Sequence, residues 1–392
     1  MFPTLSHIIE YLTGIYVPLP VQTFGLFVAF AFFAAYWVFS KELERKEKEG
    51  LIKPIYRRVT IGERPNIYEI ITNALVGFII GYKLLYAVLN YRLMVDDPQG
   101  FLLSLAGNFF GGLILAALFG YWAYAEKKRN QLSKPKEIEE VVKLKDLMGK
   151  VLLWAAIWGL IGAKLFHNLE YWDEFVNDPI TGLLSFSGLT FYGGVIFGGI
   201  AVIYYTGKQG IKPLHMLDIG APGIMLGYAI GRLGCQLSGD GDWGINNTYL
   251  KPTWLGWAPD WVWAFKFPHN VINAGVPIAD CTGKFCHELP LPVYPTSFYE
   301  FLMCMFLFAV LWLLRKRIRT AGILFCIYLL LNGIERFLIE LIRVNSKYHV
   351  LGIRFTQAEF ISLLMIISAI IGISYAKSYA ERNPDTVAPK YV

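Results

Sequence analysis

The strongest constraint on this chain is a series of apolar runs of about 20 residues, the length that a helix needs to cross the hydrocarbon core of a bilayer. Only 17% of the residues are charged, whereas soluble domains carry about 25%. The sequence therefore predicts an all-α polytopic membrane protein that forms a single integral membrane domain over residues 1–392. The nine expected transmembrane helices cover residues 20–40, 69–90, 103–124, 149–168, 189–207, 216–236, 297–314, 321–341 and 356–377.

Clusters of lysine and arginine follow alternate spans, and this pattern predicts which side of the membrane each loop faces. The clusters begin at Lys41, Lys127, Lys208 and Arg315. By the positive-inside rule these loops are cytoplasmic, so that the N-terminus and the 238–296 loop lie outside and the C-terminus lies inside. Because the net charge of +6 is spread over these clusters, no nucleic-acid partner is expected. The start of the chain lacks the basic and small-residue pattern of a removable signal peptide.

Two segments of the chain, 77–112 and 159–194, carry the same pattern of polar and small residues. Each contains a lysine, an Asp-Pro step, a Leu-Leu-Ser motif and a double glycine in the same order. Duplicated helix pairs are common in membrane folds, and we expect residues 69–148 to be an additional copy of the pair. Chance similarity between apolar sequences is the alternative explanation.

The loop 238–296 is the largest segment expected outside the membrane. Its tryptophan, proline, glycine and asparagine content predicts a small folded cap on the outer face or an interfacial arm. The spacing of Cys281 and Cys286 is compatible with a structural disulfide in an oxidising compartment. A metal site completed by His287 is the alternative, although two thiols and one histidine leave a zinc ion without a fourth ligand.

Two arginines lie within apolar runs, Arg232 at the outer end of the sixth span and Arg336 near the outer end of the eighth. A charged residue in a membrane segment is costly and is a candidate for a functional site. Asn332, Glu340 and Arg343 share one approximate helical face with Arg336, and such a polar stripe lines a cavity more often than it faces lipid. Two guanidinium groups can bind a phosphate by bidentate hydrogen bonds. The alternative is that each arginine extends to the lipid headgroups.

Further polar residues are expected near these arginines. Asp240 and Asp242 lie in a glycine-rich turn, where a carboxylate pairs with an arginine, acts as a general base, or is simply solvated. Tyr299 and Glu300 open the seventh span, and Ser297 with Glu300 has the spacing of a capping box.

Two other groups of residues are expected at the ends of spans. Tyr192, Gly193 and Gly194 open the fifth span, where paired glycines allow the backbone to approach another backbone or a ligand. Asp218 is expected to be a carboxylate at the start of the sixth span.

At these residues the sequence resembles a known family, the prolipoprotein diacylglyceryl transferases. The run 231–244, Gly-Arg-Leu-Gly-Cys-Gln-Leu-Ser-Gly-Asp-Gly-Asp-Trp-Gly, is similar to the family signature Gly-Arg-Leu-Gly-Asn-Phe-x-Asn-Gly-Glu-x-Trp-Gly. Arg336, Glu340 and Arg343 resemble a later family helix in which Glu and Arg follow an Arg by four and seven residues. The resemblance extends in order from about residue 20 to residue 345.

The resemblance implies transfer of a diacylglyceryl group from phosphatidylglycerol to the lipobox cysteine thiol in the signal peptide of a preprolipoprotein. It implies an enzyme in the bacterial cytoplasmic (inner) membrane, facing membrane lipid, with the active site towards the periplasm and with no cofactor or metal. Arg232 and Arg336 would hold the phosphate, Tyr192 would bind the headgroup, and Asp240 or Asp242 would be the acid/base or would orient Arg232. The expected substrate-binding residues are Gly193, Gly194, Asn332, Glu340, Arg343, Tyr299 and Glu300.

The sequence departs from the family at several polar positions. The family's His-Gly-Gly, whose histidine is a proposed base, reads Tyr-Gly-Gly at 192–194, and two signature asparagines are Cys235 and Ser238. The family has seven spans, so the 69–148 pair supplies two more. The alternatives are a diverged paralogue that binds phospholipid or uses another acceptor, and a transporter. A transporter should instead show broken helices near the midplane of two halves.

Overall fold

The computed structural model describes residues 1–52, 55–142, 147–184, 190–345, 347–350 and 353–383, and within them one long helix occupies each predicted apolar run. The fifth predicted span begins at Leu189, which lies outside the described residues. Six of the helices described here, α2, α3, α6, α7, α12 and α14, are long and apolar enough to cross a membrane, in agreement with the predicted polytopic membrane protein. The long helices are α2 (Thr23–Lys48), α3 (Ile67–Leu89), α6 (Phe109–Arg129), α7 (Met148–Glu170), α10 (Phe191–Lys208), α11 (Pro213–Ser238), α12 (Thr296–Leu314), α13 (Ile323–Glu340) and α14 (Gln357–Arg382).

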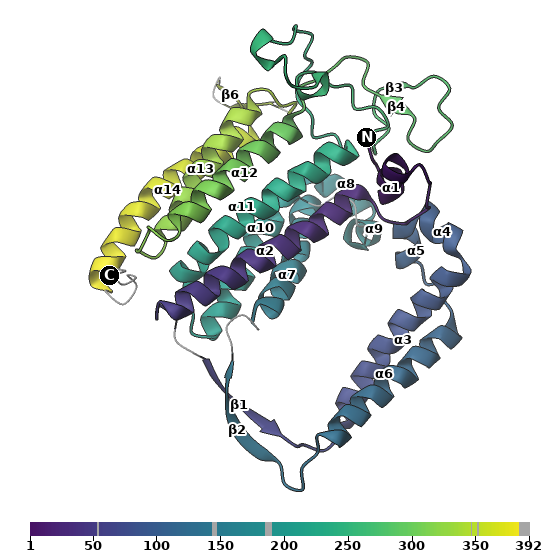
Figure 1. Ribbon diagram of the computed structural model, residues 1–392, viewed down its shortest axis with the longest axis vertical. Helices are drawn as coiled ribbons and strands as arrows, with labels where there is room; N and C mark the ends of the chain where they lie inside the picture. Colours follow the sequence, from purple (N-terminus) through teal and green to yellow (C-terminus); the bar gives the residue numbers. More distant parts are fainter. Residues whose placement is uncertain (53–54, 143–146, 185–189, 346, 351–352, 384–392) are drawn as a thin grey trace.

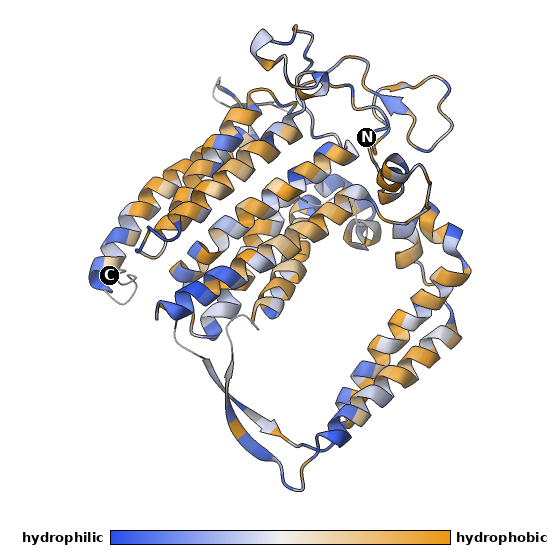
Figure 2. Ribbon diagram, in the orientation of Figure 1, coloured by the Kyte–Doolittle hydropathy of each residue, from blue (hydrophilic) through white to orange (hydrophobic). Residues whose placement is uncertain are grey.

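Helix α11 lies at the centre of the main bundle, where α2, α10, α12 and α13 pack against it (Figure 1). Apolar residues cover the length of the bundle, and polar residues gather towards its ends (Figure 2). Small residues on α11 allow this crowding: a Cβ at Gly234 would lie 2.7 Å from the Phe27 Cβ of α2. The C-terminal end of α11, which carries Arg232, is therefore enclosed by neighbouring helices, and the Arg232 side chain is only 15% exposed.

The helix pairs α3–α6 and α7–α10 are built in the same way. Gly81 packs against Gly111 in the first pair and Gly162 against Gly193 in the second, and a Cβ on any of them would clash with the opposite backbone. The connections also correspond, although Ser185 and Phe186 of the second copy lie outside the described residues. They consist of the short helices α4 (Tyr91–Asp96) and α5 (Pro98–Leu103), and α8 (Trp172–Asn177) and α9 (Pro179–Leu184).

An antiparallel ribbon of β1 (Ile55–Ile61) and β2 (Lys136–Val142) leads from the bundle to the α3–α6 pair, which stands apart from the bundle in Figure 1. We call residues 56–141 the arm. For the residues of these two strands, the sequence pattern predicts charged loops and no ribbon. The strands pair opposite charges, as where Arg58 lies 3.4 Å from Glu139, and such cross-strand pairs favour a ribbon.

The 238–296 segment is a folded cap over one end of the bundle. It contains two single-turn helices, η2 (Thr253–Leu255) and η3 (Asp260–Val262), and a short ribbon of β3 (Val276–Pro277) and β4 (His287–Glu288). Phe267, Leu289 and Val293 form its small apolar core. Cys281 and Cys286 form the expected disulfide, so the alternative metal site with His287 is wrong.

The two ends of the chain also pack at this level. The N-terminal segment with α1 (Leu5–Thr13) lies beside the cap, where the Met1 ammonium group donates to the Pro268 carbonyl at 2.7 Å. Before α14, the strands β5 (Lys347–Val350) and β6 (Ile353–Thr356) form a hairpin. The cap and the N-terminus together cover the end of the bundle where Arg232 lies.

Two predicted helix-start residues have other partners. Asp218 does not start its own helix; its carboxylate accepts hydrogen bonds from the Gly322 and Phe325 backbone N–H groups, at 2.9 and 3.1 Å, at the start of α13. The predicted capping box of Ser297 and Glu300 is also wrong, because the N-cap of α12 is Pro295 without a side-chain cap. Both carboxylates instead bind groups from distant parts of the chain, which sequence spacing does not reveal.

Candidate functional site

Three arginines and three carboxylates meet where α11, α12 and α13 approach the cap. All three arginine side chains are mostly buried, with exposed fractions between 10% and 16%. We call this group the arginine cluster; its members are Arg232, Arg336, Arg343, Asp242, Glu300 and Glu340.

Glu300 is the centre of the arginine cluster. Its side chain is fully buried, and its Oε1 lies 2.8 Å from Arg336 Nη1 and 3.4 Å from Arg343 Nη1. Its Oε2 lies 3.3 Å from Arg232 Nε, and the Tyr228 hydroxyl donates to Oε1 at 3.1 Å. One carboxylate therefore fixes the position of three guanidinium groups that come from two helices and from the segment after α13.

Asp242 is the second bridge in the cluster. One oxygen pairs with Arg232 and the other with Arg343. Its backbone carbonyl accepts hydrogen bonds from Thr296 Oγ1 at 2.9 Å and Ser297 Oγ at 2.6 Å, at the start of α12. These bonds fix the loop that carries Asp242 to the helix that carries Glu300.

Gly244 anchors the other end of the Asp242 loop. Its N–H donates to the Tyr294 carbonyl at 2.9 Å, and the next residue donates to the Ile342 carbonyl at 2.8 Å. A Cβ on Gly244 would lie 2.6 Å from the Ile342 oxygen and 2.8 Å from Thr296 Cγ2. Only glycine fits here without moving the backbone, so this position sets the distance between Asp242 and Arg343.

The remaining carboxylate, Glu340, supports Arg336. Its Oε2 lies 3.3 Å from Arg336 Nη2, and its Oε1 accepts a hydrogen bond from Asn345 Nδ2 at 2.6 Å. With Glu340 included, the three positive charges of the cluster match its three negative charges. Asp242, 31% exposed and on a loop, is the least buried of the three carboxylates and therefore the one that an anionic ligand would displace most easily.

The family model described as "Prolipoprotein diacylglyceryl transferase" matches residues 10–139 and 128–375. The chain belongs to the prolipoprotein diacylglyceryl transferase family. All members of the arginine cluster fall in the second matched segment. The first match covers the arm up to residue 139 and the second covers α7 and α10, so that each match contains one of the two similar helix pairs.

Curated relatives support the same membership. A phosphatidylglycerol–prolipoprotein diacylglyceryl transferase of Dehalococcoides mccartyi is 31% identical over 219 residues, which are 54% of this chain and 70% of the relative. The protein of that name from Staphylococcus xylosus is 28% identical over 294 residues, 74% of this chain and 93% of the relative. The Enterococcus faecalis protein of that name is 28% identical over 250 residues, 60% of this chain and 75% of the relative.

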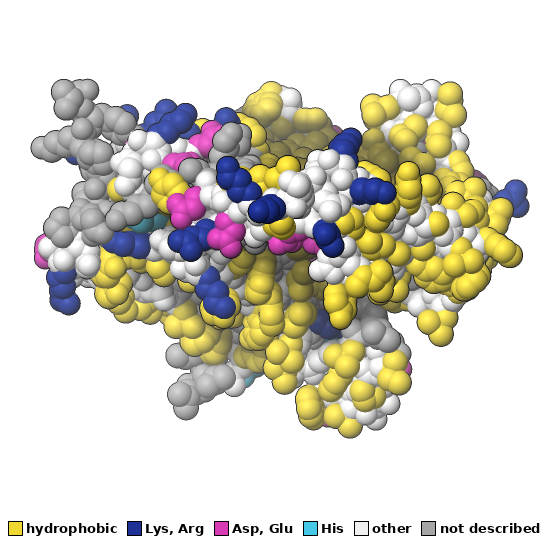
Figure 3. Space-filling model, turned by 90° about the horizontal axis from the view of Figure 1, so that it is seen from below, with side chains coloured by type: hydrophobic (Ala, Val, Ile, Leu, Met, Phe, Trp, Pro, Cys, Tyr) yellow, Lys and Arg dark blue, Asp and Glu magenta, His cyan; other side chains and the backbone are white. Residues whose placement is uncertain are grey.

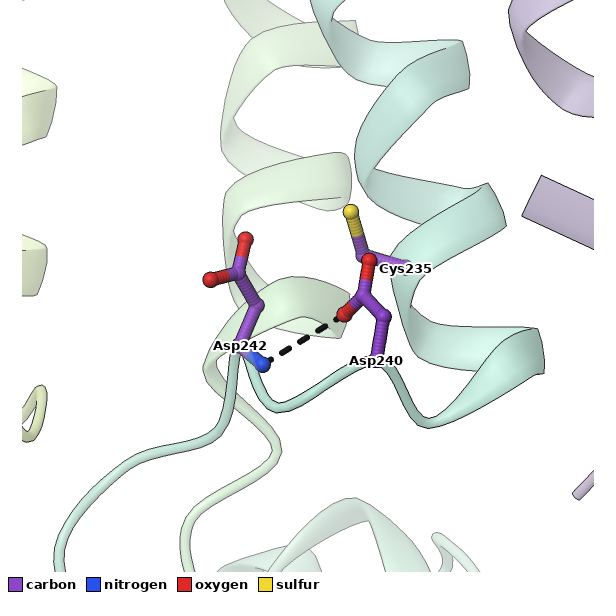
Figure 4. Close-up of side chains that lie close together, drawn as sticks. All are labelled: Cys235, Asp240 and Asp242. Carbon is purple, nitrogen blue, oxygen red and sulfur yellow. Dashed lines mark hydrogen bonds between the residues drawn. The ribbon is translucent and has the colours of Figure 1, made fainter. Parts of the chain in front are cut away.

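The structure separates the two aspartates that this member of the prolipoprotein diacylglyceryl transferase family carries after Arg232. Asp240 lies beside Cys235, and only its Oδ1 reaches Asp242, whose backbone N–H donates to it at 3.4 Å (Figure 4). Burial and the negative charge of Asp242 raise the pKa of the Asp240 carboxyl. Burial alone would also raise the pKa of Asp242, but Arg232 and Arg343 outweigh it and hold that pKa below its ordinary value. Asp242 is therefore the residue that pairs with the arginines.

Cys235, Asp240 and Asp242 place one possible ligand atom each within 4.8 Å of one another (Figure 4). Both oxygens of Asp242 already bind guanidinium groups, so a cation would have to compete with Arg232 and Arg343. The set also mixes a thiol with carboxylates, whereas hard cations prefer oxygen ligands alone. These three residues do not fit a metal centre.

Substitution of each aspartate by asparagine tests this separation through stability. The depressed pKa of Asp242 means that its contribution is present above the unfolded-state pKa and is lost as the pH falls through the folded-state pKa. The pKa of Asp240 is raised in the folded state, so its effect on stability has the opposite sign: ionisation of this carboxyl destabilises the folded state as the pH rises through that pKa. We expect Asp242→Asn to lower the unfolding temperature at neutral pH, by an amount that shrinks as the pH falls through the depressed pKa, and Asp240→Asn to maintain or raise it at neutral pH. Thermal unfolding in detergent measures both; a reversed order of the variants would contradict the assignment.

The other predicted residues lie around the cluster in different roles. Tyr192 lies close enough to Arg336 to interact with it electrostatically. Gly193 and Gly194 contact the α7 backbone, so in this structure they set the approach of α10 to α7. Asn332 lies half-buried on α13, one turn before Arg336. The Tyr299 hydroxyl donates to the Val262 carbonyl of the cap at 2.7 Å, which ties the start of α12 to the cap.

Sequence reasoning missed two residues at this site. Tyr228 stacks its ring against Arg232, with 5.0 Å between the ring centroid and the guanidinium carbon, and it also binds Glu300. Glu335 lies directly before Arg336 in the chain, and only 3% of the residue is exposed. The sequence feature that could have identified Tyr228 is its position one helical turn before Arg232. Glu335 lies about 100° from the Arg336 stripe, so helical periodicity alone does not place it in the site.

Proposed function

We propose that this chain transfers the diacylglyceryl group of phosphatidylglycerol to the thiol of the lipobox cysteine in a preprolipoprotein signal peptide. The reaction forms a thioether and releases glycerol phosphate. The names of the curated relatives support both substrates. The observation that carries the proposal for this chain is the buried arginine cluster, in which Arg232 and Arg343 share one displaceable carboxylate.

The chemistry follows from the charge balance of the cluster. A phosphodiester carries one negative charge and presents oxygens to a guanidinium group in the way that a carboxylate does. When the lipid phosphate replaces Asp242 between Arg232 and Arg343, Asp242 swings out towards water. Glu300 and Glu340 then hold Arg336, one of the two arginines predicted to bind the phosphate, beside it as a third guanidinium group. As the bond between carbon and phosphate oxygen breaks, charge grows on the departing oxygen, and the preorganised guanidinium groups stabilise it.

The proposed membrane arrangement has nine spans, including α10, α11 and α13, with the N-terminus outside and the C-terminus in the cytoplasm. Its support is the distribution of charge. Lys41, Arg45, Lys48, Arg315 and Lys316 line one hollow at the end of the bundle opposite the cap. Figure 3 shows lysine and arginine side chains gathered on this face of the molecule, with acidic side chains among them. Glu42 and Glu44 line the same hollow. The arrangement places the arginine cluster at the periplasmic face of the bacterial inner membrane.

A transfer assay tests the function directly. The purified protein is placed in nanodiscs of phosphatidylglycerol and given a peptide that carries the lipobox cysteine. We expect a peptide product with the mass of one added diacylglyceryl group, together with free glycerol phosphate. A peptide with serine in place of that cysteine is the control and should stay unmodified. Binding of phosphatidylglycerol without any transfer would instead support a diverged paralogue.

The arm is expected to be dispensable for the reaction, because the proposed site comes from α10 to α13 and from the first residues of the cap. Ile55 and Val142 are the first cross-strand pair of the ribbon, so replacing residues 56–141 by Asn-Gly joins them by a two-residue turn and removes the rest of the ribbon with the helices beyond it. We expect the shortened protein to keep transfer activity within about tenfold of the full chain, or about 1.4 kcal/mol in the barrier. Inactivity of a shortened protein that still binds phosphatidylglycerol would show that the arm takes part in transfer.

A further inference from the structure

Glu335 is a buried carboxylate without a committed partner. Its residue is 3% exposed, and neither Oε1 nor Oε2 has a hydrogen-bond partner among the residues that the structure describes. An unpaired buried carboxylate is unfavourable, because burial removes water and nothing replaces it. A buried carboxylate without a hydrogen-bond partner, next to a proposed substrate site, is a candidate for a role in the reaction.

The groups that face Glu335 come from three helices. Helix α14 packs along another side of α13, where a Cβ on Gly333 would lie 3.0 Å from the Ser362 backbone oxygen. The titratable and charged side chains that interact electrostatically with Glu335 are Tyr228 and Arg232 on α11, Glu300 and Cys304 on α12, Tyr328 and Arg336 on α13, and Arg343 after it. Glu335 thus lies against the cluster without belonging to its ion pairs.

The depth of Glu335 distinguishes it from the aspartates. Helix α12 runs inward from the cluster, so Cys304 lies one turn deeper than Glu300, and Glu335 interacts with both. Asp240 and Asp242 lie on the loop at the outer side. A lipid whose phosphate is held by the arginines has its glyceryl carbon on the inner, hydrocarbon side. A nucleophile that displaces the phosphate oxygen must approach that carbon from the side opposite the breaking bond.

We propose that Glu335 accepts the proton of the acceptor thiol. The inference rests on the proposed transferase function. The S–H bond breaks and the proton goes to a Glu335 oxygen. The thiolate then forms the C–S bond as the bond between the glyceryl carbon and the phosphate oxygen breaks. The electron pair of that bond leaves on glycerol phosphate, which remains between the guanidinium groups.

The neighbouring groups are less suited to this step. Tyr192 replaces the family histidine, and a tyrosine hydroxyl has a reference pKa of about 10, so it is a poor base at neutral pH. Glu300 is paired with three arginines, and Asp242 with two. Protonating Glu300 would break its ion pairs, and Asp242, once the bound phosphate has displaced it, lies on the outer loop away from the glyceryl carbon. Glu335 can change its protonation state without releasing an arginine.

The test compares Glu335→Gln, which keeps the shape but cannot accept the proton, with wild type in the nanodisc transfer assay. General-base removal should lower kcat by about 10²- to 10⁴-fold, while the KM for phosphatidylglycerol changes by less than about threefold. The ascending limb of the wild-type profile of kcat against pH should disappear in Glu335→Gln and return, shifted, in Glu335→Asp. Glu69→Gln, a change on the surface of α3, is the control and should behave as wild type. A Glu335→Gln enzyme with wild-type kcat and pH profile overturns the proposal.

A second measurement separates failure of this inference from failure of the proposed function. Infrared difference spectra between acidic and alkaline pH should show a carboxyl band in wild type that is missing in Glu335→Gln. Absence of transfer by wild type would refute the function, whereas identical infrared titrations of the two proteins would refute Glu335 as a proton acceptor. A variant that only unfolds more easily, with unchanged kcat for the folded fraction, would show a purely structural role and also overturn the proposal.

Discussion

Replacing Arg336 by alanine should reduce transfer of the diacylglyceryl group by about 10³-fold or more, one of the largest effects on activity that we expect from a single substitution. The side chain is 16% exposed and lies 2.8 Å from Glu300 and 3.3 Å from Glu340. Its loss removes a positive charge from the phosphate site and leaves two buried carboxylates short of a partner. Both effects oppose the build-up of negative charge on the leaving phosphate.

The measurement is kcat/KM in phosphatidylglycerol nanodiscs, with the variant's fold checked by its unfolding temperature. Arg58→Ala is the matched control, because Arg58 pairs with Glu139 at the surface of the arm with 76% of its side chain exposed. That control should retain full activity. Arg336→Lys should recover only part of the loss, since an ammonium group cannot make the guanidinium's several directed contacts. Full activity of Arg336→Ala would show that the site is elsewhere.

The sequence alone predicts the helices well because a membrane leaves few choices. Backbone groups in lipid must pair within the segment, so an apolar run of about 20 residues becomes a helix. The same cost identifies Arg232 and Arg336, since an arginine inside such a run needs a partner. The spacing of Glu340 and Arg343 after Arg336 then places two more members of the arginine cluster on one helical face.

The sequence could not predict which aspartate matters. Asp240 and Asp242 are separated by one glycine in a turn, where no helical or strand period fixes the direction of a side chain. The choice depends on Thr296 and Ser297, which bind the Asp242 carbonyl from a helix more than 50 residues later in the chain. The same contact uses the hydroxyl of Ser297 that the capping-box spacing assigned to a local role.

Other misses have a similar cause. Glu335 lies off the polar stripe, so its burial depends on how α12 packs against α13. The β1–β2 ribbon depends on pairing between segments about 80 residues apart. By contrast, the Cys281–Cys286 disulfide closes a short loop, so sequence spacing was sufficient to favour it. Prediction of the site from the sequence is therefore limited mainly by unknown contacts between distant segments, and less by recognising which side chains can take part in the chemistry.

Replacing Glu300 by glutamine should cause the largest loss of stability. The carboxylate is fully buried, interacts with Arg232, Arg336 and Arg343, and accepts a hydrogen bond from Tyr228. Glutamine keeps the shape but removes the charge, so the remaining carboxylates no longer balance three buried guanidinium groups. Breaking a buried ion pair from one side typically destabilises a protein by about 3–5 kcal/mol.

The matched control is Glu69→Gln, which removes a pairing with Lys127 at 3.0 Å where both side chains are more than 40% exposed. Surface pairs of this kind contribute about 1 kcal/mol or less. Unfolding in bicelles measures both variants, and Glu300→Gln should be destabilised several times more than the control. Equal stability of the two variants would mean that Glu300 does not hold the arginines. In that case Asp242 would be the main partner of the three arginines. When a phosphate displaced Asp242, the guanidinium groups would then lose their fixed positions, and no preformed phosphate site would remain.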